Sequence, residues 1–436
     1  MIDKENISSL HPSEIAKILR ELNDDEFKSY IKDIPKDIIG DVILEMPDRY
    51  FGDMVDIVDI KDLSHAISEL ESDDQTDFIQ ELEEHDEIKA KKLFNSLDSD
   101  DQADILQLKK YNDNEAGAYM QIEVFTAKES ENTDAVIKEF AKLKKSGELE
   151  NVQYLFITKD NNYLTYGISL EDLLIFDFNK LVIENIEESS EDFIPIVGYD
   201  RQDIYEIVDK FKEFDLGVMP IVDENNILIG RITSDDILDI VNEQATEQMF
   251  NMAGVDDEAE EEEGIFQAGK QRAIWLSLNL LTAIMASIVI GLFSGTLESI
   301  VALAILMPIV ASMGGNAGTQ SLTVVVRQLA LGDISSNDAI RTIKKEVILS
   351  VANGLLFAII MGIIAYIWFN EELLGVVIAL SMVINLFFAG FFGAGIPLML
   401  KRLNIDPAIG SSVILTTVTD VVGFLSFLGL ATIILL

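Results

Sequence analysis

The segment 408–436, AIGSSVILTTVTDVVGFLSFLGLATIILL, is long and apolar and contains a single ionisable side chain, Asp420. A helix that begins near Ala408 rises about 1.5 Å per residue, so Asp420 would lie roughly 18 Å along it, near the middle of a bilayer. A carboxylate there costs at least about 2.5–3.5 kcal/mol and usually faces a water-filled path or a partner charge. No Lys or Arg lies near the same depth in the sequence. The segment therefore predicts a membrane span that carries a cation site.

Four more apolar segments are long enough to cross about 30 Å of hydrocarbon. With the last one they give five predicted spans, at 274–292, 300–326, 347–369, 373–400 and 408–436. Every base after position 264 precedes span one or lies between spans two and three or spans four and five: Lys270, Arg272, Arg327, Arg341, Lys344, Lys345, Lys401 and Arg402. The positive-inside rule makes that side cytoplasmic and puts the C-terminus outside the cell membrane. Buried core helices of a soluble protein would not separate the charges in this way.

The charge of the chain is concentrated in its first part. The whole sequence has 76 acids and 32 bases, and the eight acids after residue 264 balance the eight bases there, so the formal charge of −44 belongs to residues 1–264. This charge argues against nucleic acid as a partner and favours cations, although any single acid is more simply interpreted as part of a solvated surface. With no Cys and only three His, oxygen ligands that suit Mg²⁺ or Ca²⁺ predominate. The polar start, MIDKENISSLHPSE, does not fit a signal peptide, so we expect residues 1–264 in the cytoplasm.

Residues 10–110 show helical periodicity in short segments that recur about every twelve residues. Such helices cannot bury a face alone, so the pattern predicts a helical superhelix, whose simplest role is an interaction module. From 120 to 245 the pattern changes to short apolar strands, each followed by an acidic helix start. The predicted strands are Gln153–Thr158, Leu164–Ile168, Gly217–Val222 and Ile227–Ile232.

The strand-to-helix segment 230–238, GRITSDDIL, resembles the signature of a CBS domain, and the region 120–245 resembles a pair of them. In that family the Thr and Asp of Gly-x-x-Thr-x-x-Asp contact a nucleotide ribose, which implies Thr233 and Asp236 as nucleotide-binding residues and ATP as a ligand. The first copy, 167–172 GISLED, is one residue short between Gly and Ser. The alternative roles are dimerisation and helix capping by Thr233 and Ser169.

Span two contains the polar run 312–321, SMGGNAGTQS, after Pro308. Three Gly permit close backbone approach or a break in the helix, and the polar side chains could line a cavity or hydrogen-bond neighbouring helices. Before span one, the acidic run 256–263 is either a disordered linker or a helix that carries cation ligands to the mouth of a pore.

From end to end the chain resembles the MgtE magnesium channels. The resemblance rests on 307–321 MPIVASMGGNAGTQS with Arg327, on Asp406-Pro407-Ala408, and on 416–423 TTVTDVVG. It implies a multidomain integral membrane protein with an all-α acidic N domain (1–120), two α/β CBS domains (121–185 and 186–245), a connecting plug helix (246–270) and a five-helix transmembrane domain (271–436). It implies a homodimer in which Asp420 binds hydrated Mg²⁺ in the pore, Asp406 lies at the cytoplasmic mouth, and the connecting helix closes the pore at high cytoplasmic Mg²⁺.

The resulting hypothesis is a Mg²⁺ channel, not an enzyme, that mediates uptake and is gated by cytoplasmic Mg²⁺, with Co²⁺ or Mn²⁺ as further candidate ions. The predicted metal-binding residues are Asp420, Asp406, Asp256, Asp235 and Asp223, and the predicted pore-lining residues are Asn316, Gly315, Thr319, Thr416 and Thr417. The chain departs from the family at Ser412-Val413, where relatives commonly have Pro, and at 61–65 KDLSH, where relatives often carry a sensing Asp-Asp-Leu-x-Asp. Two alternatives remain: a proton-coupled divalent-cation transporter that uses Asp420, and a nucleotide-sensing signalling protein anchored in the membrane.

Overall fold

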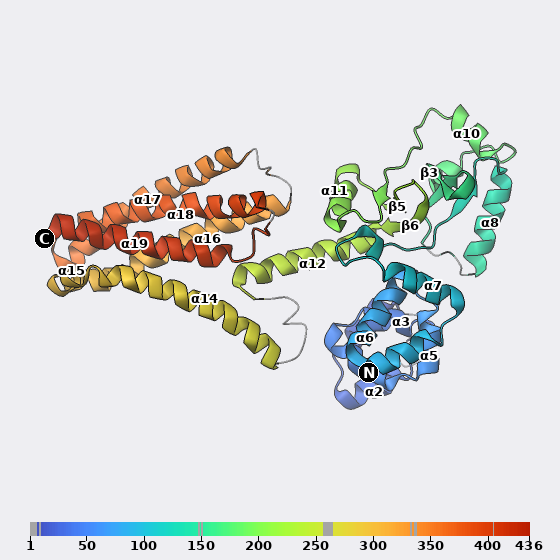
Figure 1. Cartoon of the computed structure of the whole chain (residues 1–436), viewed down its shortest axis with the longest axis horizontal. Helices are drawn as coiled ribbons and strands as arrows, with labels where there is room; N and C mark the ends of the chain where they lie inside the picture. Colours follow the sequence, from blue (N-terminus) through green and yellow to red (C-terminus); the bar gives the residue numbers. More distant parts are fainter. Residues whose placement is uncertain are drawn as a thin grey trace. The chain divides into compact units, whose positions relative to one another are not determined.

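The computed structural model describes residues 7, 10–146, 149, 151–255, 265–331, 334, 338–403 and 405–436. The chain forms two compact units, Met1–Asn242 and Glu243–Leu436. The first unit contains a helical part and two small sheets, and the second contains the long apolar helices (Figure 1).

The helical part of the first unit packs its short amphipathic helices around one apolar core. Polar side chains begin several of these helices: the Asn23 side chain accepts a hydrogen bond from Glu26 N, and Asp98 accepts from the first backbone N–H groups of the last helix. The longest helix is kinked at Asp86, whose φ of −149° is not helical. The spacing of about twelve residues predicted only short helices, but this helix is 23 residues long. The helices are α1 Pro12–Leu19, α2 Asp24–Ile31, α3 Ile39–Leu44, α4 Phe51–Ile57, α5 Ile60–Ile67, α6 Ser72–Phe94 and α7 Ser99–Leu108.

Two three-stranded sheets follow, each with one parallel and one antiparallel strand pair. The four predicted strands are confirmed to within one residue at each end. The first strand of each sheet was missed, because two or three residues are too few to show an alternating pattern. The strands are β1 Thr126–Lys128, β2 Tyr154–Thr158, β3 Leu164–Ser169, β4 Gly198–Tyr199, β5 Val218–Val222 and β6 Leu228–Thr233; the helices are α8 Thr133–Ser146, α9 Leu170–Leu173, α10 Val182–Glu188, α11 Ile204–Phe214 and α12 Ser234–Ala253.

A buried arginine joins the helical part to the second sheet. Arg231 on β6 is only 2% exposed, and its backbone exchanges two hydrogen bonds of 2.8 Å with Gln121. Its guanidinium donates to Gln121 Oε1 at 3.1 Å and to Glu71 Oε1, just before α6, at 3.3 Å. Because a buried guanidinium needs such partners, these contacts fix the start of α6 against β6.

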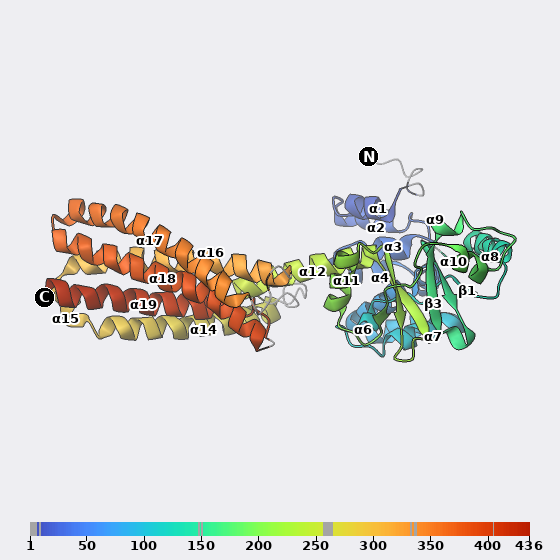
Figure 2. The same ribbon diagram turned by 90° about the horizontal axis from the view of Figure 1, so that it is seen from above.

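Within the described residues of the second unit, five helices are long and apolar enough to cross a membrane, which agrees with the five predicted spans. Helix α18 is the most enclosed and packs against α16, α17 and α19 (Figure 2). Close approach depends on small residues: a Cβ at Gly390 would lie 2.3 Å from Ser350 Oγ on α17, and one at Gly393 would lie 2.7 Å from Gly318 O on α16. The helices are α14 Ile265–Gly291, α15 Ser294–Ser299, α16 Val301–Ala330, α17 Ala339–Phe369, α18 Glu372–Arg402 and α19 Ser411–Leu435.

Candidate functional site in the membrane unit

The polar run of span two lies on one continuous helix. Helix α16 continues through Pro308 and through the three Gly, so these Gly serve close packing and do not break the helix. Gly314 and Gly318 face the interior of the bundle, whereas Asn316 and Thr319 are exposed. A Cβ at Gly315 would have nothing within 4 Å. The predicted pore residues of α16 therefore lie on a face that this single chain leaves open.

Asp420 lies on α19 and is partly buried. Among the described residues, no Lys or Arg forms an ion pair with it. The hydroxyls of Thr416 and Thr417 donate to carbonyls of their own helix, Ser412 O at 2.8 Å and Val413 O at 2.7 Å. These two threonines thus have only the lone pairs of their hydroxyl oxygens to offer a passing cation.

Helices α16 and α19 run antiparallel, and two contacts fix their register. Asn385 on α18 lies against Gly314 of α16 and Gly423 of α19: added Cβ atoms there would lie 2.2 and 2.9 Å from its Nδ2. Farther along, a Cβ at Gly318 would lie 3.0 Å from the Leu415 side chain. Gly314 and Gly423 therefore lie on either side of one amide, and Gly318 lies beside the Leu415 side chain.

Between these two contacts, residues 314–318 of α16 lie beside residues 415–423 of α19. Asn316 lies midway along the first of these segments, and Asp420 lies within the second, so both lie between the same two contacts. The structure thus brings the predicted carboxylate and the predicted amide into the same part of the bundle. Asn316 Nδ2 also donates to Ser312 Oγ at 3.3 Å, one turn away.

A cavity of about 400 Å³, lined by both apolar and polar residues, lies beside Asn316 between α16, α17 and α18. Asn316, Thr319 and Gln320 line it from α16, and Asn353 lines it from α17. Gln320 belongs to the polar run whose side chains were considered as the lining of a cavity, whereas the sequence interpretation missed Asn353. The signal for Asn353 was available, because an isolated amide within an apolar span is costly unless it has a polar neighbour.

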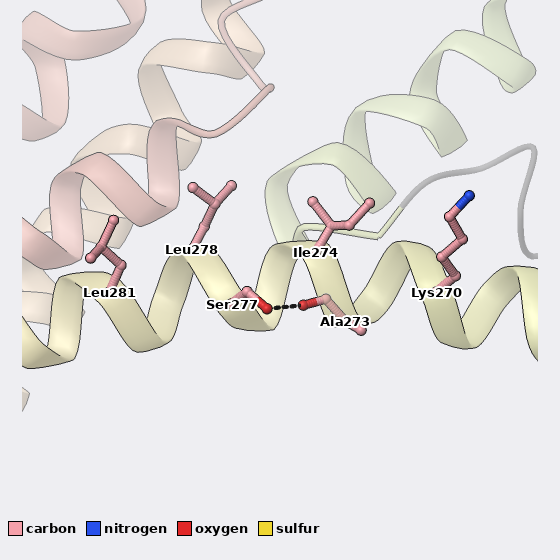
Figure 3. Close-up of a pocket in the computed structure, with 6 residues that line it drawn as sticks. All are labelled: Lys270, Ala273, Ile274, Ser277, Leu278 and Leu281. Carbon is pink, nitrogen blue, oxygen red and sulfur yellow. Dashed lines mark hydrogen bonds between the residues drawn. The ribbon is translucent and has the colours of Figure 1, made fainter.

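Another recess, of about 560 Å³, runs along a single helix, α14. Figure 3 shows Lys270, Ile274, Leu278 and Leu281 projecting from the same side of the helix, while Ser277 donates to Ala273 O at 2.6 Å. Its lining is mostly aliphatic, so it offers no set of ligands for a cation.

The predicted cytoplasmic ligands are spread over the chain. Asp406 is partly buried and its Oδ1 accepts from Ala408 N at 2.7 Å. Asp235 is exposed in the first turn of α12. Asp223 lies in a turn; burial raises its pKa, but hydrogen bonds from Ile227 N and Asn225 outweigh this and lower the pKa overall. Asp256 lies outside the described residues.

The two predicted nucleotide residues contact each other. Thr233 Oγ1 donates to Asp236 Oδ2 at 2.6 Å, and Thr233 N donates to the same oxygen at 3.1 Å. In the first sheet, Ser169 caps α9 by accepting from Asp172 N at 3.1 Å. Both contacts are of the helix-capping kind that was the alternative role for these residues.

A cluster of acids at the start of α6 faces α12, and sequence reasoning missed it. Burial raises the pKa of Glu71 to about 7 even though Arg231 lowers it. Burial, with the charges of Asp74 and Asp236, raises the pKa of Asp73 well above its usual range. The Oδ1 atom of Asp73 is buried without a hydrogen-bond partner. No group of three or more acids or histidines among the described residues is arranged to hold a metal ion directly.

Comparison with known proteins gives three family matches. The MgtE family, described as divalent cation transporters, matches residues 307–430; the MgtE intracellular N domain matches 10–114; and the CBS domain matches 194–243. The chain is 31% identical over 332 residues to the magnesium transporter MgtE of Thermus thermophilus, which covers 75% of this chain and 72% of that protein. It is 32% identical over 301 residues to the magnesium transporter MgtE of Bacillus subtilis, which covers 69% of this chain and 64% of that protein.

One solved structure shares the fold of the first unit. The crystal structure of the cytosolic domain of the Mg²⁺ channel MgtE in complex with ATP matches with a TM-score of 0.50 at 23% identity, over 54% of this chain and 93% of that one. The helical part and the two sheets therefore form the same arrangement of elements as in a solved cytosolic domain.

Proposed function

The chain belongs to the MgtE family, so it is a multi-pass membrane protein that transports Mg²⁺ and is not an enzyme; on that premise we propose that it is a homodimeric channel whose ion path runs along α16 and α19. The observation that carries this proposal is the position of Asp420. It is a carboxylate without an ion pair among the described residues, and it lies between the same two helix contacts as Asn316. In this path Asp420 is the cation ligand, and Asn316, Gly315, Thr319, Thr416 and Thr417 line the walls.

The ion's chemistry supports the use of two copies of the chain. Mg²⁺ gives up its water reluctantly and is usually bound through one or two carboxylates with several waters retained. One chain supplies one carboxylate at this depth, and a two-fold axis would supply the second. The open face around Gly315 is where a second copy would complete the path. Co²⁺ and Mn²⁺ accept similar ligands, so we include them as further ions.

The charge distribution supports an orientation in the cell membrane. All eight bases of the membrane part lie on the side of residues 1–264, so we propose a cytoplasmic N-terminus and an extracytoplasmic C-terminus. Uptake then follows the electrochemical gradient, since an inside-negative potential contributes roughly 4.6 kcal/mol per 100 mV for a divalent ion.

The acids of the first unit support a role as sensor. Burial, together with the nearby charges of Glu123 and Asp74, raises the pKa of Glu71 to about 7. A bound Mg²⁺ would offset negative charge at this place as a proton does. We propose that Asp235, Asp223 and Asp256 bind regulatory Mg²⁺. We propose also that Asp406 and the segment after α12 close the pore. ATP is a candidate ligand near Thr233 and Asp236, because a cytosolic domain of the same fold was crystallised with ATP.

Divalent-cation flux in proteoliposomes tests the path. Asp420→Ala should abolish Mg²⁺ flux in a protein that still folds, because the substitution removes a costly charge and little packing. The matched control is Glu298→Ala, which removes one acid from the short helix α15 outside the proposed path. Undiminished Mg²⁺ selectivity in Asp420→Ala would refute the assigned role, and flux that follows the pH gradient at fixed voltage would favour a proton-coupled transporter.

A further inference from the structure

The most completely buried amide of the membrane unit is not part of the proposed ion path. Asn385 on α18 has none of its surface exposed, although Ser381 is the only other polar side chain between Leu373 and Leu400 of this helix. A buried amide in a membrane is costly unless it is hydrogen-bonded, so its presence here requires an explanation.

Asn385 joins three helices. Its Nδ2 donates to Val310 O on α16 at 2.8 Å. Its side chain occupies a slot between Gly314 and Gly423, where added Cβ atoms would lie 2.2 and 2.9 Å from Nδ2. Only glycine leaves room for the amide at these two positions. The amide therefore holds α16 and α19 at one fixed distance and register through α18.

The oxygen of this amide gains no hydrogen bond from the packing. Asn385 Oδ1 is buried and has no hydrogen-bond partner among the described residues. Turning the amide over would not help, because Oδ1 would then face the Val310 carbonyl, which is also an acceptor. An apolar side chain would fill the slot without an unpaired oxygen, so the hydrogen bond to α16 is the property that distinguishes Asn here.

The contact of Asn385 with Gly314 and Gly423, which we call the clamp, lies next to the proposed ion ligands. Gly314 lies two residues before Asn316 on α16, and Gly423 lies three residues after Asp420 on α19. A slip of one residue along a helix moves a side chain by about 1.5 Å and turns it by about 100°. A shift of that size between α16 and α19 would change the distance between the carboxylate and the amide that face the ion.

We propose that Asn385 is a positioning residue that holds α19, which carries Asp420, in register with α16, which carries Asn316, and thereby sets the ion selectivity of the path, an inference that rests on the proposed function. Asn385 does not contact the ion. It acts on the spacing of two groups that do, and a site that recognises a hydrated ion by its size depends on that spacing.

The test uses the full-length protein in proteoliposomes and measures Mg²⁺ and Na⁺ flux on the same samples. Asn385→Ala should lower the ratio of Mg²⁺ to Na⁺ flux about tenfold, because a misplaced ligand affects the preferred ion most. The matched control is Ser381→Ala, one turn away and equally buried, whose hydroxyl donates only to Val377 O of its own helix. A protein that was merely less folded would lose both fluxes together and keep their ratio.

A second pair of variants reaches the same clamp without removing the amide. Gly423→Ala places a methyl group 2.9 Å from Asn385 Nδ2 and should lower the ratio as well, whereas Gly429→Ala meets only Phe293 at 3.9 Å and should not. The double variant Asn385→Ala/Gly423→Ala should be no worse than Asn385→Ala alone, since both changes break one contact.

The outcomes separate the two proposals. The positioning role alone would be overturned if the losses of Mg²⁺ over Na⁺ selectivity from the two substitutions multiplied in the double variant. It would also be overturned if the flux ratios of Asn385→Ala and Gly423→Ala were unchanged while Asp420→Ala lost selectivity. Selectivity retained in Asp420→Ala would instead overturn the ion path itself.

Discussion

At the scale of single residues, the polar and small residues of the membrane unit fall into two groups that differ in their surroundings. Asp420 and Asn316 lie between the same two helix contacts and Asn316 is exposed, whereas Gly314 and Gly423 are closed in by Asn385. Neighbouring glycines of one sequence motif therefore have different physical roles. Gly314 is required because a side chain would collide, and Gly315 has open space on its face.

The charge of Asp420 can be removed without changing the size of the side chain. In Asp420→Asn the amide keeps the volume but loses the negative charge that attracts a divalent ion, so we expect Mg²⁺ flux to fall at least about tenfold while Na⁺ leak persists. The measurement is flux of both ions under an imposed potential. A channel that still prefers Mg²⁺ over Na⁺ would contradict the electrostatic role of the carboxylate.

The open face of α16 can be tested with a large side chain. Gly315→Leu should block flux or prevent the dimer from forming, because the proposed path and the second copy share this face. Gly395→Leu is the matched control, since a Cβ there also has nothing within 4 Å but lies on α18. Flux would be compared together with oligomeric state; two equally active dimers would mean that the face around Gly315 meets only lipid.

At the scale of elements, helix α6 bears carboxylates that lose water on folding. Burial, with the charges of Asp48, Glu84 and Asp77, raises the pKa of Glu81 to about 8. Glu71, just before the helix, has its pKa raised to about 7, mainly by burial. A raised folded-state pKa means that the folded chain binds more protons than the unfolded chain. Stability from these groups is therefore fully present below pH 4.5 and is lost as the pH rises through 7 to 8.

We therefore expect the thermal unfolding midpoint of the first unit, followed in the full-length protein, to rise by at least about 3 °C between pH 8.5 and 5.5. Glu81→Gln should reduce this dependence, because the amide does not titrate. Glu139→Gln, an exposed acid on α8 paired with Lys142, is the control and should leave it unchanged. A midpoint that falls with acidification over this range would show that these carboxylates are solvated in solution.

At the scale of the whole molecule, the formal charge of −44 lies in the part of the chain that precedes the spans. Two such parts in a dimer repel each other unless counter-ions gather. Mg²⁺ can bridge acids, whereas monovalent ions only screen them. Charge balance thus offers a physical link between cytoplasmic Mg²⁺ and the compactness of the proposed sensor.

Deletion of residues 1–264 tests that link. The remaining spans should form a dimer that conducts but no longer closes as cytoplasmic Mg²⁺ rises through the millimolar range, which is ordinary for weak carboxylate sites. Open probability against Mg²⁺, with and without that region, is the measurement, and equal inhibition of both forms would place the sensor within the membrane unit. Monovalent salt at matched ionic strength is the control and should close the intact channel only weakly.

The sequence by itself determined the features that depend on local chemistry. Span length, the side on which Lys and Arg gather, the four longer strands and the isolated Asp420 all follow from runs and periods within one segment. The two short strands and the long, kinked α6 did not follow, because a few residues carry no period and a kink depends on packing by neighbours.

The tertiary structure decided which polar residues belong together. Asn385 and Asn353 were single amides in apolar spans with no local sign of a partner, and the acids around Asp73 belong to elements far apart in the chain. The register of the helices that carry Asp420 and Asn316 depends on the slot between Gly314 and Gly423. Such contacts join segments about a hundred residues apart, and their register depends on how side chains of three helices fit, which no period within one helix encodes.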